Sequence, residues 1–228
     1  MKLTSRPATL MIVSVIVTAA LYYLPYVRVL AWPLVLLSTL AHELGHGLAA
    51  AVLGGRFEAL RMYPDASGVA TWSGPLGRIG VATVAGAGLV GPALAAFCML
   101  VFGRTPRGAR MMLGCVGTGL VLVALLVARN PFAFAFILIL AAALIAVAIR
   151  SDRLAQMVVV LIAVQLALAV FSRSDYLFTR TAMTSAGPAP SDVSVMAAAL
   201  FLPYWVWGLV CGGLSLALLA AGARRFLR

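Results

Sequence analysis

Residues 34–54 read LVLLSTLAHELGHGLAAAVLG, a nearly unbroken apolar run as long as a membrane-spanning helix. His42, Glu43 and His46 lie in the middle of this run, and the chain contains no other histidine. A carboxylate at membrane depth costs on the order of 3 kcal/mol by insertion scales, so residues of this kind are normally functional. The run therefore predicts a membrane helix that carries a polar functional site.

The rest of the chain has the composition of a multi-span membrane protein. Of its 228 residues, 64% are hydrophobic and 10% are charged, and the mean hydropathy is +1.09. A soluble domain of this size needs more polar surface. We expect one all-α membrane domain over residues 1–228 with six or seven transmembrane helices, six if the fourth and fifth apolar runs are less regular than two full spans. The runs predict spans at about 8–27, 30–53, 79–102, 109–128, 131–149, 154–171 and 199–221.

Two segments do not have the pattern of a span. Residues 54–77 contain glycine, proline and short alternating stretches, which predict a small β-hairpin-like insert after the second span. Residues 172–198 form the longest polar stretch, in which GPAP at 187–190 breaks helix and favours an extended turn. Ser191 and Asp192 then precede an apolar run, as residues at a helix start do.

The basic residues indicate membrane anchoring. The net charge is +11, and sixteen of the seventeen basic residues are arginines scattered between apolar runs. Arginines at span ends extend to lipid headgroups, so we expect a lipid bilayer around the chain and no nucleic acid bound to it. The first run resembles a signal sequence without a small-x-small cleavage site, and we interpret it as an uncleaved span. The predicted location is a bacterial plasma membrane, with several passes.

The five residues from His42 to His46 form an HExxH motif. On a helix, positions i and i+4 share one face, so both imidazoles can reach one metal ion. Glu43 projects from nearly the same face and can act as a general base and then as a general acid. The motif predicts a zinc site with His42 and His46 as metal ligands and Glu43 as the catalytic residue.

Catalytic zinc usually has three protein ligands and water, and no third histidine exists. Glu58 and Asp65 lie in the hairpin-like insert, and Asp152 lies between two arginines, so we expect these three carboxylates to face water. Asp175 and Asp192 remain as candidates for the third ligand. The three cysteines all lie in apolar segments, where packing is their ordinary role and metal binding a weaker alternative: Cys98, Cys115 and Cys211.

Three stretches of the sequence resemble the site-2 protease family of intramembrane zinc metallopeptidases, in particular its compact bacterial branch. They are STLAHELGHGLAAAVLGGRFEALRMYPDASGVA at 38–70, AGAGLVGPALAA at 85–96 and SDVSVMAAALFLPYWVWG at 191–208. The resemblance implies a third ligand at an aspartate in a later segment, which places it at Asp192. Many members have a glycine after this aspartate, whereas neither Asp175 nor Asp192 has one, and Asp175 stays the alternative.

The sequence therefore predicts an HExxH zinc metalloendopeptidase that cleaves transmembrane protein substrates within or next to their spans. The insert at residues 56–73 could hold such a substrate extended by pairing with it, and a proline at Val69 would then reduce cleavage without changing metal content. Two other function classes are a non-catalytic membrane scaffold with a structural metal site and a metal or ion transporter. The sequence predicts neither the identity of the substrate nor the oligomeric state.

Overall fold

The computed structural model describes residues 7–23, 31–172, 177–184 and 187–228. Within these ranges the chain forms helices and two short hairpins. The helices are α1 (Pro7–Tyr23), α2 (Trp32–Val52), α3 (Arg78–Gly103), α4 (Pro106–Val127), α5 (Pro131–Arg150), α6 (Asp152–Ser172), α7 (Asp192–Leu200) and α8 (Tyr204–Leu227). The strands are β1 (Arg56–Met62), β2 (Gly68–Ser73), β3 (Thr181–Thr184) and β4 (Gly187–Pro190).

Six of the described helices are long and apolar enough to cross a membrane: α2, α3, α4, α5, α6 and α8. The prediction of an all-α membrane fold with a hairpin insert is confirmed. The fourth and fifth runs form two full helices, α4 and α5, so the less regular alternative is wrong. Each begins with a proline at its first position, Pro106 and Pro131, where the missing N–H is not needed. The predicted first span corresponds to the shorter α1, and residues 24–27 of that prediction lie outside the described residues.

The predicted last span, 199–221, has the wrong boundaries. Residues 199 and 200 belong to the short helix α7, and the spanning helix α8 begins at Tyr204 and ends at Leu227. Phe201 has a left-handed backbone (φ 64°) that ends α7, and Pro203 cannot continue a helix because it has no N–H. The apolar character of FLPYW hid this break from the sequence pattern.

The second hairpin, β3–β4, was not predicted. The GPAP segment is extended as expected, but it is strand β4, paired antiparallel with β3 from Thr181 opposite Pro190 to Thr184 opposite Gly187. Proline is tolerated in a strand where its nitrogen faces away from the partner. Pro188 and Pro190 satisfy this condition, because the ladder continues through the Ser191 N–H, which donates to the Arg180 carbonyl, and alternates from there.

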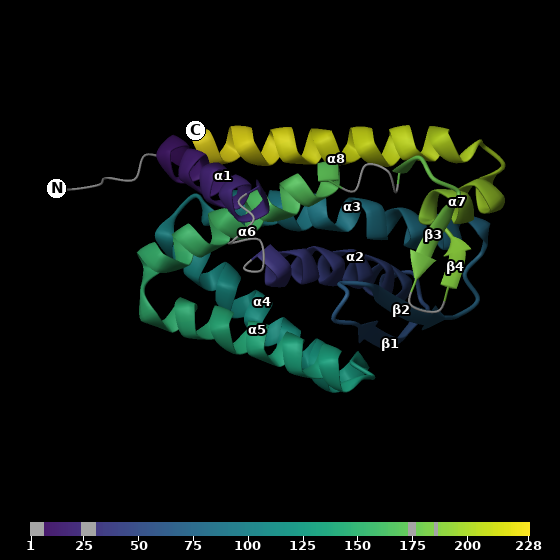
Figure 1. Cartoon of the computed structure of the whole chain (residues 1–228), viewed down its shortest axis with the longest axis horizontal. Coiled ribbons are helices and arrows are strands. Elements are labelled where there is room, and N and C mark those ends of the chain that lie inside the picture. Colours follow the sequence, from purple (N-terminus) through teal and green to yellow (C-terminus); the bar gives the residue numbers. More distant parts are fainter. Residues whose placement is uncertain (1–6, 24–30, 173–176, 185–186) are drawn as a thin grey trace.

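Figure 1 shows α8 along the top of the molecule, α4 and α5 along the bottom, and α2 between these layers. Helix α3 packs against α2, α6, α7 and α8. Both hairpins and α7 lie at the same end of the bundle, the end opposite the C-terminus and the start of α1 (Figure 1). The elements that follow α2 and those that precede α8 therefore meet at one place.

The first hairpin folds back along α2. The Trp32 indole N–H donates to the Pro64 carbonyl at 2.7 Å, and the Thr39 hydroxyl donates to the Ala66 carbonyl at 2.7 Å. Leu60 and Met62 of β1 are fully buried in the main apolar core. The prediction of a hairpin over residues 54–77 is confirmed, and its strands form part of the core.

The outer edge of β1 is covered by the loop between α4 and α5. The Asn130 side-chain amide donates to the Met62 carbonyl at 2.7 Å and accepts from the Met62 N–H at 3.3 Å. The Arg129 N–H donates to the Leu60 carbonyl at 3.0 Å. Because one edge of the hairpin is covered in this way, the edge left for other partners belongs to β2.

Candidate metal centre

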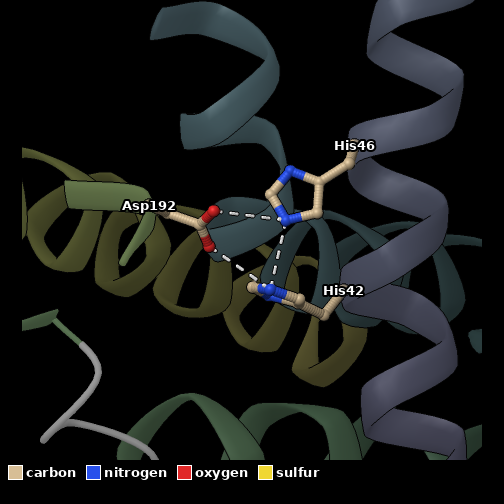
Figure 2. A group of neighbouring side chains, drawn as sticks. All are labelled: His42, His46 and Asp192. Atoms are coloured by element: carbon tan, nitrogen blue, oxygen red, sulfur yellow. Dashed lines mark hydrogen bonds and ion pairs between the residues drawn. The ribbon is translucent and has the colours of Figure 1, made fainter. Parts of the chain in front are cut away.

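Helix α2 presents both histidines of the HExxH motif to one point in space. Their imidazole rings meet edge to face with centroids 4.7 Å apart, and the two Nε2 atoms are 3.2 Å apart. This is the arrangement that the i, i+4 spacing predicts for two ligands of one ion. Figure 2 shows His42 and His46 reaching from α2 toward the same carboxylate.

That carboxylate belongs to Asp192, the first residue of α7. Its two oxygens lie 3.3 Å from His42 Nε2 and 3.4 Å from His46 Nε2 (Figure 2). The preceding residue, Ser191, caps the helix through its hydroxyl, which accepts from the Ser194 N–H. Asp192 is therefore free of the capping role, and its side chain is available to a metal ion.

The β3–β4 hairpin fixes the position of Asp192. The Ser191 hydroxyl donates to the Thr179 carbonyl at 2.6 Å, and the Ser191 N–H donates to the Arg180 carbonyl at 3.0 Å. Burial raises the pKa of the Asp192 carboxyl, but the adjacent His46 and His42 imidazoles outweigh burial and hold this pKa below its ordinary value. Only the ionised form of a carboxyl group can act as a metal ligand.

The three side chains fit a tetrahedral zinc ion. Ligand atoms about 2.0–2.1 Å from one zinc ion in tetrahedral geometry lie roughly 3.3–3.4 Å from each other. The nearest ligand atoms of His42, His46 and Asp192 are separated by 3.2, 3.3 and 3.4 Å. Two imidazoles and one carboxylate also form a typical donor set for catalytic zinc.

The surroundings of His46 fix its tautomer. Its Nδ1 lies 2.9 Å from the Val84 carbonyl, which can only accept, so Nδ1 carries the proton and Nε2 is left with a lone pair for a metal ion. Gly88 makes room for this ring, because a Cβ at position 88 would collide with the imidazole. Gly88 of α3 therefore accommodates the ring of a metal-ligand candidate.

Glu43 lies beside the histidines and is only 7% exposed. One of its carboxylate oxygens, Oε2, accepts a hydrogen bond from the Ala70 N–H of strand β2 at 2.7 Å. No hydrogen bond from another described residue reaches the second oxygen, Oε1. The hairpin thus holds one end of the carboxylate in place and leaves the other available for proton transfer.

Glu43 and the three candidate ligands open onto one cavity of about 500 Å³. The first hairpin lines it through residues 65–70 and Trp72, and the second hairpin through Ala182 and Pro190. Val81 and Val84 of α3 contribute apolar wall. The site is therefore a cleft between two hairpins that has room for a peptide and for water.

The family-model comparison identifies the chain as a peptidase-type protein. The model for the family described as Peptidase M50B-like matches residues 12–222, nearly the whole chain. The chain belongs to this family. Comparisons with curated proteins and with solved structures gave no match. The family consists of metallopeptidases of the site-2 protease type, which agrees with the resemblance noted in the sequence and, with six candidate spans, makes the chain an integral multi-pass membrane protein.

Within the described part of this M50B-like chain, His42, His46 and Asp192 are the one group of three metal-ligating side chains close enough to share an ion. Asp175, the alternative third ligand, lies outside the described residues. Glu58 accepts a hydrogen bond from the Ser73 hydroxyl, and Asp152 pairs with Arg110 at 3.2 Å. Neither carboxylate belongs to the group of His42, His46 and Asp192. None of the three cysteines joins the group.

Asp65 lines the cavity but has partners of its own. The hydroxyl and the backbone N–H of Ser67 both donate to it and lower the pKa of the Asp65 carboxyl. Sequence reasoning missed three parts of the site: the Ala70 N–H, the Val84 carbonyl and the second hairpin. The first two are backbone groups, for which a side-chain pattern carries no signal.

Proposed function

We propose that this chain is an intramembrane zinc metalloprotease that hydrolyses peptide bonds within or next to transmembrane segments of membrane proteins in a bacterial plasma membrane. The observation that carries the proposal is the triad of His42, His46 and Asp192 with Glu43 beside it on one cavity. These three residues would hold the zinc ion. The lipid bilayer and a transmembrane substrate are the partners.

Bound zinc supplies Lewis-acid polarisation of the peptide carbonyl and acidification of a water molecule. Glu43 performs the proton transfers. Because Oε2 is held by the Ala70 N–H, Oε1 is the oxygen that accepts a proton from the attacking water and then donates it to the departing amide nitrogen.

The free edge of β2 would hold the substrate in an extended conformation. Helical amides are shielded by their own hydrogen bonds, so a substrate helix must unwind before hydrolysis, and an extended segment can pair with an exposed strand edge. The Ala70 N–H points to Glu43, away from β1, so by alternation the backbone groups of Gly68 and Trp72 also face the cavity side. These two positions are where a substrate strand would form its hydrogen bonds.

The same alternation changes the choice of test position. The backbone of Val69 faces β1, so a proline there would damage the hairpin itself and would not report on substrate pairing. Trp72 is the better position, because Gly68 is packed against Thr39 and Glu43 and has no space for a larger residue.

Replacing Trp72 with proline should lower cleavage of a transmembrane substrate more than replacing it with alanine. Both variants lose the indole, but only the proline variant loses the N–H that faces the cavity. One hydrogen bond contributes about 0.5–1.5 kcal/mol, so the expected difference in kcat/KM is about 2- to 12-fold. Zinc content should be the same in both variants, and equal cleavage rates would contradict pairing at this edge.

The proposed function is tested by reconstituting the purified chain in liposomes with a labelled transmembrane substrate. Cleavage should stop when zinc is removed with a chelator and return when zinc is added back, because the candidate ligands have no other metal-independent role in the reaction. Cleavage that persists after complete zinc removal would contradict the proposal. Bound zinc without any cleavage would support the scaffold alternative.

A further inference from the structure

The two histidines of the triad differ in the hydrogen-bond partner of their second ring nitrogen, Nδ1. His46 donates from Nδ1 to the Val84 carbonyl, which fixes the ring and its tautomer. His42 contacts His46 and Asp192 through Nε2, and its Nδ1 has no hydrogen bond to any described residue. Metal-binding histidines almost always donate their second ring N–H to a partner, so His42 requires one that the described protein groups do not supply.

A small second cavity is also lined by His42. It has a volume of about 40 Å³, and its polar lining side chains are Ser38, His42 and Ser215. Its apolar lining comes from α3, α6 and the residue Leu177. A cavity needs about 10–15 Å³ of such volume to hold one water molecule, so this one has enough room.

The two serines of this cavity have free hydrogen-bonding capacity. Ser38 lies one turn before His42 on α2, and its hydroxyl donates to the Leu34 carbonyl at 3.1 Å, which leaves its lone pairs available. Ser215 on α8 is only 1% exposed, and its hydroxyl makes no hydrogen bond to a described residue. A serine in a membrane helix commonly bonds back to the carbonyl four residues earlier. Ser38 does so, whereas Ser215 does not, and its hydroxyl is therefore available to water in the cavity that Ser215 lines.

We propose that this cavity holds ordered water that accepts the His42 Nδ1–H and is itself held by Ser215 and Ser38. The water would keep the proton on Nδ1 and leave the Nε2 lone pair directed at the metal ion. Ser215 and Ser38 are then positioning residues that act on zinc affinity through water and His42. The inference rests on the proposed zinc site and adds to it a hydrogen-bond partner for the Nδ1 of His42.

The test compares Ser215→Val with Ser215→Thr, two variants of nearly equal volume that differ in the hydroxyl. Zinc affinity is measured on the purified full chain by competition with a chelator. Loss of an outer-shell partner typically weakens metal binding about 10- to 100-fold, so we expect a loss of that size for Ser215→Val and near wild-type affinity for Ser215→Thr. Thr18→Val, which removes a fully buried hydroxyl from α1, is the control and should leave zinc affinity unchanged.

A second readout separates positioning from a general loss of structure. The chain contains only two histidines, so labelling histidine with ¹⁵N gives two side-chain signal sets. Ser215→Val should shift the His42 ring nitrogens and leave those of His46 in place. Equal zinc affinities for the valine and threonine variants, or equal shifts at both histidines, would overturn the inference while leaving the zinc site intact. A wild-type chain that binds no zinc would overturn the proposed function and this inference together.

Discussion

Replacing Glu43 with glutamine should lower cleavage of a transmembrane substrate by about 10²- to 10⁴-fold, the range that a positioned general base contributes. Glutamine has nearly the same shape, and its amide oxygen can still accept the Ala70 N–H that Glu43 accepts at 2.7 Å. It cannot take a proton from water. Packing and hydrogen bonding are therefore retained, and only the proton transfer is removed.

Zinc content separates this prediction from a structural effect. Glu43 is not one of the proposed metal ligands, so Glu43→Gln should bind as much zinc as the wild type. The matched control is Glu58→Gln in strand β1, where the carboxylate accepts from the Ser73 hydroxyl outside the triad. We expect that control to keep activity within about 2-fold, as surface substitutions usually do. A Glu43→Gln variant that cleaves at the wild-type rate would refute the assigned role of Glu43.

The sequence pattern was sufficient for the spans because the physics of a membrane helix is local. An apolar run of about 20 residues meets its requirements without help from distant segments. The short helix α7 and the hairpin β3–β4 depend on more than composition. Phe201 ends α7 through a left-handed backbone, and β4 pairs through GPAP, a segment whose prolines argue against a strand.

In the candidate site too, the local feature was predictable from the sequence and the long-range contacts were not. His42 and His46 are one turn apart on one helix, so their convergence followed from the motif alone. Asp192 lies far along the chain, and only the resemblance to a family favoured it over Asp175. Its place beside the histidines depends on the β3–β4 ladder and on Ser191, and these long-range contacts have no signature in a single sequence.

Replacing Asp192 with alanine should remove zinc from the chain and, with it, proteolysis. The carboxylate lies 3.3 Å and 3.4 Å from the two Nε2 atoms, so its loss leaves two imidazoles as protein ligands where catalytic zinc usually has three. The fold should persist, because Ser191 caps α7 and Asp192 does not. Asp65→Ala is the control within the same cavity, since Asp65 is bonded to Ser67 and not to the triad.

The zinc-to-protein ratio of the purified wild type, Asp192→Ala and Asp175→Ala tests the central claim most directly. It can be measured by elemental analysis of the same preparations that are assayed for cleavage. A site made by His42, His46 and Asp192 predicts about one zinc per chain in the wild type and in Asp175→Ala, and almost none in Asp192→Ala. A full zinc complement in Asp192→Ala, with loss of zinc in Asp175→Ala, would contradict this metal centre.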